Sequence, residues 1–234
     1  MPERVFSFKQ FKVRHGRSAM KIGTDAVLLG AWCKVPENGY FLDIGCGSGI
    51  ISLMLAQRGK QPVTAVEIDA EAYLEAVENI CESPWKNRIN VVLGDIRKLS
   101  LSKRFSLIVC NPPFYTGSNS PDDKRNIARH DSSLSPAGLF AVLDSLLDCE
   151  GLFYMIYPGN RQFEIWEEAS KNNLFCNALL SVKPRENLAP VRLIFCFSRH
   201  QVSVIKTELV IETHQRNEFT EEYKKLTADF YLKF

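Results

Sequence analysis

The sequence lacks the segments that would direct a protein into or across a membrane. No stretch of its 234 residues approaches the roughly 20 consecutive apolar residues of a membrane-spanning helix. The opening residues, Met1-Pro2-Glu3-Arg4, do not resemble the apolar core of a signal peptide. We therefore expect a cytoplasmic protein with no membrane contact.

Closely spaced cysteines are also missing. The seven cysteines are scattered, and no two have the C-x-x-C spacing of a metal or redox pair. Most of them fall in apolar runs, which is typical of buried thiols in a reducing compartment. The pattern predicts neither a metal site nor a disulfide framework.

A strong excess of charge is absent, because the net charge is only +2. The charge is unevenly distributed, however. Residues 1–21 contain six basic side chains against Glu3 alone: Arg4, Lys9, Lys12, Arg14, Arg17 and Lys21. Such a cluster can neutralise phosphates, so Lys9, Lys12 and Arg14 are candidate RNA contacts. The alternative is a solvated, loosely ordered N-terminal arm.

Strands and helices alternate along the chain, with no internal repeat. The apolar patterns predict strands at 40–44, 63–68, 89–93, 105–110, 152–157, 175–182 and 191–197, and helices at 24–33, 49–58, 69–81, 136–147, 161–172 and 220–228. We expect Thr24 and Asp69 to cap their helices and Pro136 to lie in the first turn of its helix. The alternation predicts a mostly parallel sheet with helices on both faces.

The last two of these strands need a different connection. The segment 183–190 between them holds two prolines and is too short for a helical crossover, so the strands pair antiparallel or do not pair directly. We expect a single α/β domain over 1–234, with a basic arm and helix at 1–35, a catalytic core at 36–200 and a C-terminal extension at 201–234.

A glycine loop follows the first of these strands and opens a helix. Gly45, Gly47 and Gly49 allow a tight turn and the close approach of a ligand to the backbone. Glu67, about 20 residues later at the end of a strand, suits a ribose diol. The spacing is G-x-G-x-G instead of the G-x-G-x-x-G of dinucleotide sites, and Asp43 would repel a pyrophosphate but attract an ammonium group. This speaks against a nicotinamide oxidoreductase.

The pattern D-x-G-x-G-x-G resembles the first motif of the class I S-adenosylmethionine methyltransferases. The resemblance implies S-adenosylmethionine as cofactor and a Rossmann-like sheet that is mostly parallel with an antiparallel C-terminal strand. It also implies that Asp95 accepts the cofactor's adenine amino group, although an aspartate that caps a turn is the alternative. The implied cofactor-binding residues are Asp43, Gly45, Cys46, Gly47, Gly49, Glu67, Ile68, Asp95, Ile96 and Asn111.

The segment Asn111-Pro112-Pro113-Phe114 directly follows the strand at 105–110. Two prolines fix φ and supply no amide hydrogens, so the segment offers acceptors on a stiff frame. The Asn111 amide oxygen and the Pro112 carbonyl can each accept one hydrogen of an amino group, while Phe114 can stack on a planar base. We predict that these four residues are catalytic; a rigid loop with Phe114 packed on the core is the alternative.

This order of motifs resembles the amino-methyltransferases, in which N-P-P-[FY] ends the fourth strand. Glutamine-N5 protein methyltransferases and guanine-N2 or adenine-N6 RNA methyltransferases share it, so the motif indicates a planar nitrogen and leaves these substrates open. Glutamine methyltransferases usually carry a separate N-terminal helical domain, whereas only about 35 residues precede the first strand here. A catalytically silent RNA-binding module is disfavoured by the intact motif.

A closer resemblance covers nearly the whole chain. Phe8-x-x-Phe11-x-Val13 and the segment 20–32, MKIGTDAVLLGAW, are similar to the bacterial adenine-N6 methyltransferases that modify adenine-37 of a valine tRNA. The resemblance implies a tRNA substrate and no obligatory protein partner. The polar loop after the catalytic segment suits a polynucleotide, and we add Tyr115, Arg129 and His130 to the candidate RNA contacts.

Overall fold

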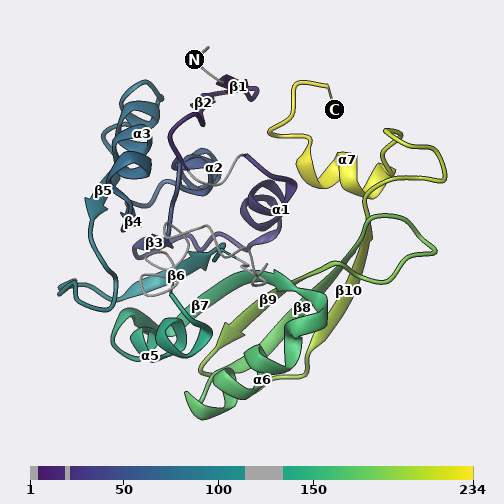
Figure 1. The fold of residues 1–234 in the computed structure, drawn as a ribbon. Helices are drawn as coiled ribbons and strands as arrows, with labels where there is room; N and C mark the ends of the chain where they lie inside the picture. The colour runs from purple at the N-terminus through teal and green to yellow at the C-terminus, as the bar shows by residue number, and fades with distance from the viewer. Residues whose placement is uncertain (1–4, 19–21, 114–133, 234) are drawn as a thin grey trace, which may run out of the picture.

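An eight-stranded sheet forms the centre of the fold (Figure 1). The computed structural model describes residues 5–18, 22–113 and 134–233. The strand order is β10-β8-β9-β7-β6-β3-β4-β5. The strands are β3 (Phe41–Ile44), β4 (Val63–Glu67), β5 (Ile89–Leu93), β6 (Phe105–Cys110), β7 (Leu147–Pro158), β8 (Phe175–Lys183), β9 (Arg192–Ser198) and β10 (Ile205–Val210).

The sheet is mostly parallel, as the sequence predicts. Strands β5, β4, β3, β6 and β7 pair in parallel, whereas β9 runs antiparallel to both β7 and β8. The antiparallel pairing of the last two predicted strands is therefore confirmed. Strand β10, which the sequence patterns do not predict, adds to the edge in parallel with β8.

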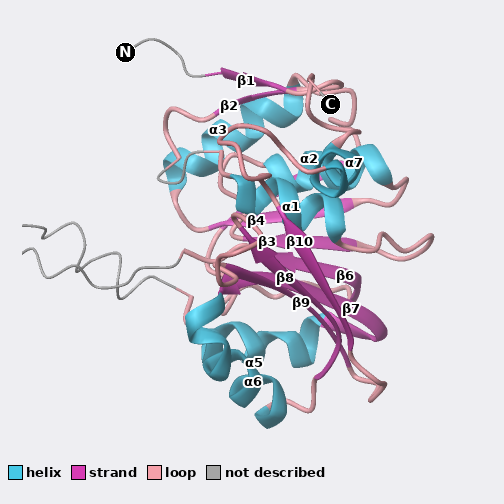
Figure 2. Cartoon of the chain, turned by 90° about the vertical axis from the view of Figure 1, so that its right-hand side faces the viewer, coloured by secondary structure: helices cyan, strands magenta, loops and turns pink. Residues whose placement is uncertain are grey.

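Helices cover both faces of the sheet (Figure 2). On one face lie α1 (Thr24–Trp32), α2 (Ile50–Arg58), α3 (Ala70–Cys81) and α7 (Glu221–Thr227); on the other lie α5 (Pro136–Leu146) and α6 (Gln162–Lys171), which follows the short 3-10 helix η1 (Gly159–Arg161). Each predicted helix is present to within two residues. In the described part of the chain, no helix is long and apolar enough to cross a membrane.

The central strands are buried on both sides, which explains their continuous apolar sequences. In β6, Leu107 and Val109 pack in the core beneath α1, α2 and α3, whereas Ile108 and Cys110 pack in the core beneath α5 and α6. The period of two along the strand therefore divides its side chains between two cores.

Two of the three predicted helix starts are confirmed, and one is wrong. Asp69 accepts a hydrogen bond from the Ala72 amide at 2.9 Å, and Pro136 lies in the first turn of α5, as expected. Thr24 is wrong as a cap, because it is already the first helical residue. Gly23 occupies the capping position in an extended conformation, and it has no side chain with which to cap.

The N-terminal segment is a packed hairpin, so the alternative of a loose arm does not apply to residues 5–18. Strands β1 (Val5–Ser7) and β2 (Lys12–Arg14) pair antiparallel, and Phe8 and Phe11 between them are buried, with ring centroids 4.6 Å apart. Phe8 also stacks on Tyr231 at 6.0 Å, and the Lys9 amide donates to the Phe230 carbonyl at 2.8 Å. The hairpin therefore lies against the C-terminal residues.

Substitution of Phe140 in α5 tests the packing of the core between the sheet and helices α5 and α6. Its ring is fully buried and contacts Phe153 and Phe197 edge to face, at 5.7 and 5.5 Å between centroids. Phe140→Ala should lower the free energy of unfolding by about 3–5 kcal/mol, because it leaves a cavity. Phe163→Ala is the matched control, since that ring is 78% exposed, and it should change stability by less than about 0.5 kcal/mol. Equal effects in urea unfolding would contradict this packing.

Candidate functional site

The predicted site residues follow neighbouring parallel strands. The glycine loop follows β3, Glu67 ends β4, Asp95 follows β5 and Asn111 follows β6. These strands run parallel and adjacent, so their carboxyl ends meet at one edge of the sheet. That edge is where ligands bind in open α/β sheets.

The glycine loop has a backbone that other residues rarely adopt. Gly45, Gly47 and Gly49 have φ of 71°, 55° and 83°, in the left-handed region. A Cβ placed on Gly45 or Gly47 would meet no described atom within 4 Å, so the space beside this backbone is open. A ligand can therefore lie directly against the loop.

Glu67 is held by backbone amides on both sides. Its Oε2 accepts from the Gly47 amide at 2.8 Å, and its Oε1 accepts from the amides of Ile68 and Asp69 at 2.8 and 2.9 Å. The residue is only 7% exposed. Oε1 already accepts two hydrogen bonds, whereas Oε2 keeps a further lone pair, so the group is rigidly oriented and still able to accept from a ligand hydroxyl.

Asp43 lies beneath the loop, fully buried in β3. Its Oδ2 accepts from the Ser52 hydroxyl of α2 at 2.7 Å, while its Oδ1 has no hydrogen-bond partner within the described residues. Burial raises the pKa of Asp43 to about 7, although the hydrogen bond from Ser52 opposes the rise. An unsatisfied buried carboxylate oxygen is costly in the free protein and would be stabilised by a cation.

Asp95 has a partner that the sequence does not reveal. Its carboxylate accepts from the Arg97 guanidinium at 2.9 Å to Oδ1 and 2.8 Å to Oδ2, and from the Arg97 amide at 3.0 Å. These hydrogen bonds hold the pKa of Asp95 below its usual range. This is the geometry of an aspartate that caps a turn, which is the alternative given in the sequence analysis. A hydrogen bond from the cofactor's adenine to Asp95 stays a prediction. Of the other residues predicted to bind the cofactor, Ile96 and Cys46 are buried, whereas Ile68 is 45% exposed.

Asn111 carries an orphaned acceptor at the end of β6. Its Oδ1 is buried and has no hydrogen-bond partner in the part of the chain that the structure describes. Pro112 is buried and Pro113 exposed. Phe114, Tyr115, Arg129 and His130 lie outside the described residues.

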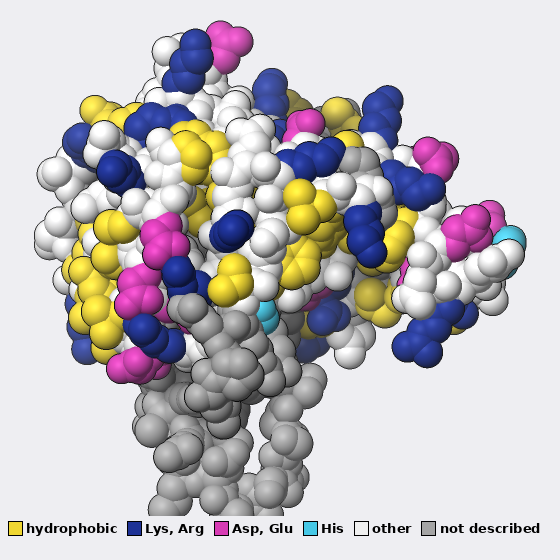
Figure 3. All heavy atoms as spheres, turned by 90° about the horizontal axis from the view of Figure 1, so that it is seen from above, with side chains coloured by type: hydrophobic (Ala, Val, Ile, Leu, Met, Phe, Trp, Pro, Cys, Tyr) yellow, Lys and Arg dark blue, Asp and Glu magenta, His cyan; other side chains and the backbone are white. Residues whose placement is uncertain are grey.

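The basic residues of the N-terminal hairpin have intramolecular contacts. The Lys9 ammonium donates to the Ala228 carbonyl at 2.6 Å, and the Arg14 guanidinium pairs with Glu82. Lys12 is exposed, and no ion pair to it occurs among the described residues. Figure 3 shows Lys and Arg spread over this side of the molecule with acidic groups between them, instead of a single basic stripe.

Comparison with known proteins identifies the family. Residues 16–175 match the family described as the methyltransferase small domain, which is more than half of the chain. The chain belongs to the methyltransferase small domain family.

Relatives of this methyltransferase are similar over their full length. A protein of Bacteroides thetaiotaomicron is 40% identical and one of Phocaeicola vulgatus is 41% identical, each over 99% of both chains. One of Trichodesmium erythraeum is 41% identical over 98% of both chains. All three are named tRNA1(Val) (adenine(37)-N6)-methyltransferase.

Solved structures support the fold. The structure of a predicted O-methyltransferase from Agrobacterium tumefaciens has a TM-score of 0.61 at 18% identity, covering 88% of this chain and 96% of that one. A glycopeptide N-methyltransferase complexed with S-adenosylmethionine has a TM-score of 0.57 at 15% identity, covering 80% and 98%. The Rossmann-like methyltransferase fold class is therefore confirmed.

Two residues at the methyltransferase site have no motif signal in the sequence. Ser52 holds Asp43 and Arg97 holds Asp95, but an isolated serine or arginine carries no motif.

The raised pKa of Asp43 gives the methyltransferase a pH-dependent stability. The folded state keeps this proton up to about pH 7, whereas the ordinary value is 3.8, so the free energy of unfolding decreases as pH rises across that interval. Asp43→Asn cannot ionise and should lose this component, so its stability relative to the wild type should increase from pH 5 to pH 8. Urea titrations at each pH measure this, with Asp229→Asn as the control at an exposed aspartate. Parallel profiles for all three proteins would contradict the assignment.

Proposed function

We propose that this protein transfers a methyl group from S-adenosylmethionine to the exocyclic N6 of an adenine in tRNA, with adenine-37 of a valine tRNA as the target. The observation that carries the proposal is the buried Oδ1 of Asn111, which has no hydrogen-bond partner among the described residues and belongs to the sequence Asn-Pro-Pro-Phe directly after β6. The names of the full-length relatives at 40–41% identity support the choice of substrate.

The residues at the sheet edge fit S-adenosylmethionine. The open space beside Gly45 and Gly47 admits a ligand against the backbone, and Glu67 presents a fixed carboxylate for ribose hydroxyls. Asp43 directly precedes the same loop in β3, and its Oδ1, which has no partner in the described part of the chain, suits an ammonium group. When bound, the cofactor supplies an electrophilic methyl group on a sulfonium.

Asn111 and Pro112 address the weak nucleophilicity of an aromatic amine. The lone pair of such a nitrogen is delocalised into the ring. The Oδ1 of Asn111 and the carbonyl of Pro112 would each accept one amino hydrogen and hold it out of the ring plane, which localises the lone pair. In-line alignment then supplies much of the rate, and no strong general base is needed. Phe114, outside the described residues, remains the predicted stacking partner of the base.

The alternatives within the enzyme class are methylation of a guanine N2 in rRNA or of a protein glutamine. The Asn-Pro-Pro-Phe segment alone suits any of these planar nitrogens. The relatives named above favour adenine, since their similarity extends over the N-terminal hairpin and the C-terminal residues as well as the core.

The proposed function is tested by labelled methyl transfer to unmodified total tRNA, followed by nucleoside analysis. We expect N6-methyladenosine, located at position 37 of valine tRNA. Methylated guanosine, or label in protein alone, would overturn the proposal.

Asn111→Ala tests the catalytic segment in the same assay. Loss of the acceptor should lower turnover by at least about 100-fold, because the amine is no longer held in line. Affinity for S-adenosylhomocysteine, measured by calorimetry, should stay within about twofold of the wild type, because the lost hydrogen bond is one to the amino group of the target base. Asn90→Ala, on an exposed residue of β5, is the matched control. An equal loss of binding and turnover would mean that Asn111 holds the cofactor instead.

Substitution of Lys12 is the clearest test of whether the hairpin binds RNA. Lys9 and Arg14 already contact Ala228 and Glu82, so their substitution would also disturb the fold. If Lys12 contacts a phosphate, Lys12→Ala should weaken tRNA binding and reduce the slope of log affinity against log salt by about 1. Lys60→Ala, at an exposed position after α2, should leave the slope unchanged. An unchanged slope in both variants would exclude Lys12 as a contact.

A further inference from the structure

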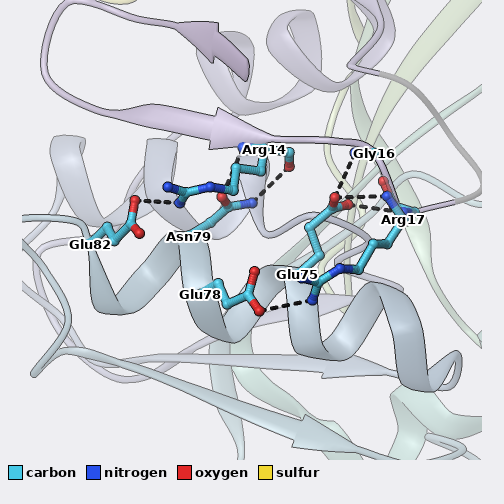
Figure 4. A network of polar contacts seen from close by, with 8 residues as sticks. Arg14, Gly16, Arg17, Glu75, Glu78, Asn79 and Glu82 are labelled. Carbon is cyan, nitrogen blue, oxygen red and sulfur yellow. Dashed lines mark hydrogen bonds and ion pairs between the residues drawn. The ribbon is translucent and has the colours of Figure 1, made fainter. Parts of the chain in front are cut away.

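Helix α3 carries two polar side chains that are almost completely buried. Glu75 is 2% and Asn79 is 1% exposed, and they lie four residues apart on one face of the helix. Buried polar groups are costly unless they are paired, so their partners show what these residues hold. Figure 4 shows that most of their partners belong to the N-terminal segment 14–18.

Glu75 binds three consecutive backbone amides. Its Oε1 accepts from Gly16 at 2.6 Å and from Arg17 at 2.8 Å, and its Oε2 accepts from Ser18 at 2.9 Å. Successive amides that converge on one carboxylate form an anion-binding turn, here occupied by the protein's own side chain. This contact fixes the backbone of the segment that follows the β1–β2 hairpin.

Asn79 joins that segment to the glycine loop. The Arg14 amide donates to its Oδ1 at 2.8 Å, and its Nδ2 donates to the Arg14 carbonyl and to the Ser48 carbonyl, each at 2.9 Å. Ser48 lies between Gly47 and Gly49, and the Gly47 amide is bound by Glu67. One side chain therefore bridges the N-terminal segment and the loop that faces the cofactor.

The ion pairs around this bridge contribute less to its position. Arg17 pairs with Glu78 at 2.8 Å, with both side chains nearly half exposed, and Arg14 pairs with Glu82, whose side chain is 58% exposed. Exposed pairs of this kind are weak, because water and salt screen them. The amide of Asn79 and the carboxylate of Glu75, which are almost completely buried, therefore define where the segment lies.

We propose that Asn79 is a positioning residue that couples the glycine loop to the N-terminal segment, so that a bound cofactor stabilises segment 14–18 and, with it, the β1–β2 hairpin. The proposal rests on the proposed function for the identity of the cofactor. Coupling of this kind is reciprocal: an RNA that binds the hairpin would raise cofactor affinity by the same factor.

Hydrogen exchange on the wild-type protein tests the coupling without any substitution. Adding saturating S-adenosylhomocysteine should slow exchange of the Arg14, Gly16, Arg17 and Ser18 amides at least fivefold. These amides donate to Asn79 and Glu75, so their exchange reports on the contact between segment 14–18 and α3. Unchanged exchange at these amides, with slower exchange at Gly47, would overturn the proposal.

Asn79→Asp isolates the bridging donor. It keeps the shape and the acceptor for the Arg14 amide, but it sets an oxygen against the carbonyls of Arg14 and Ser48. We expect the dissociation constant of S-adenosylhomocysteine to rise about 10-fold and the protection of segment 14–18 to disappear. The KM for cofactor should rise similarly, while kcat at saturating cofactor stays within threefold.

The matched control is Asn90→Asp, which makes the same chemical change on an exposed residue of β5. It should bind cofactor and protect segment 14–18 as the wild type does. Glu78→Gln, which removes the exposed pair with Arg17, should do the same. Wild-type cofactor affinity in a folded Asn79→Asp protein would overturn the proposal, and if that variant does not fold, the wild-type exchange result decides it. Both binding readouts omit RNA, so they are independent of whether the product is N6-methyladenosine.

Discussion

The cofactor edge depends on the carboxylate of Glu67 and the three backbone amides that bind it. This contact fastens the end of β4 to the turn after β3, and it does so where the glycines adopt left-handed backbone angles. A loop of three glycines would otherwise be among the least restricted parts of a chain. The carboxylate makes it a rigid surface, and the same group remains able to accept hydrogen bonds from a ligand.

Much of this arrangement could be predicted because it is local in sequence. Strands buried on both faces, such as β6, appear as uninterrupted apolar runs, and the glycine loop, Glu67 and Asn111 each follow such a run. The parallel order of the strands then brings these residues to one edge. Asp69 and Pro136 were likewise predictable, because a helix start is specified within a few residues.

What could not be predicted depends on contacts between distant residues. In the sequence, Glu75 and Asn79 look like ordinary polar residues on the exposed face of an amphipathic helix. They are buried because segment 14–18 packs on α3. The hairpin is short and basic, so its sequence resembles a solvated arm; its packing comes from Phe8 and Phe11 against aromatic rings elsewhere in the chain. Thr24 failed as a cap because a glycine one position earlier takes that place.

The ends of the described chain meet, with the turn of the β1–β2 hairpin bound to Phe230 and stacked on Tyr231. During synthesis, Phe11 can pack on Trp85 early, whereas Phe8 lacks its contact with Tyr231 until residues near 230 have left the ribosome. Part of the hairpin's aromatic surface therefore stays exposed while the sheet assembles. The turn of the hairpin is thus one of the last parts of this methyltransferase to acquire all of its neighbours.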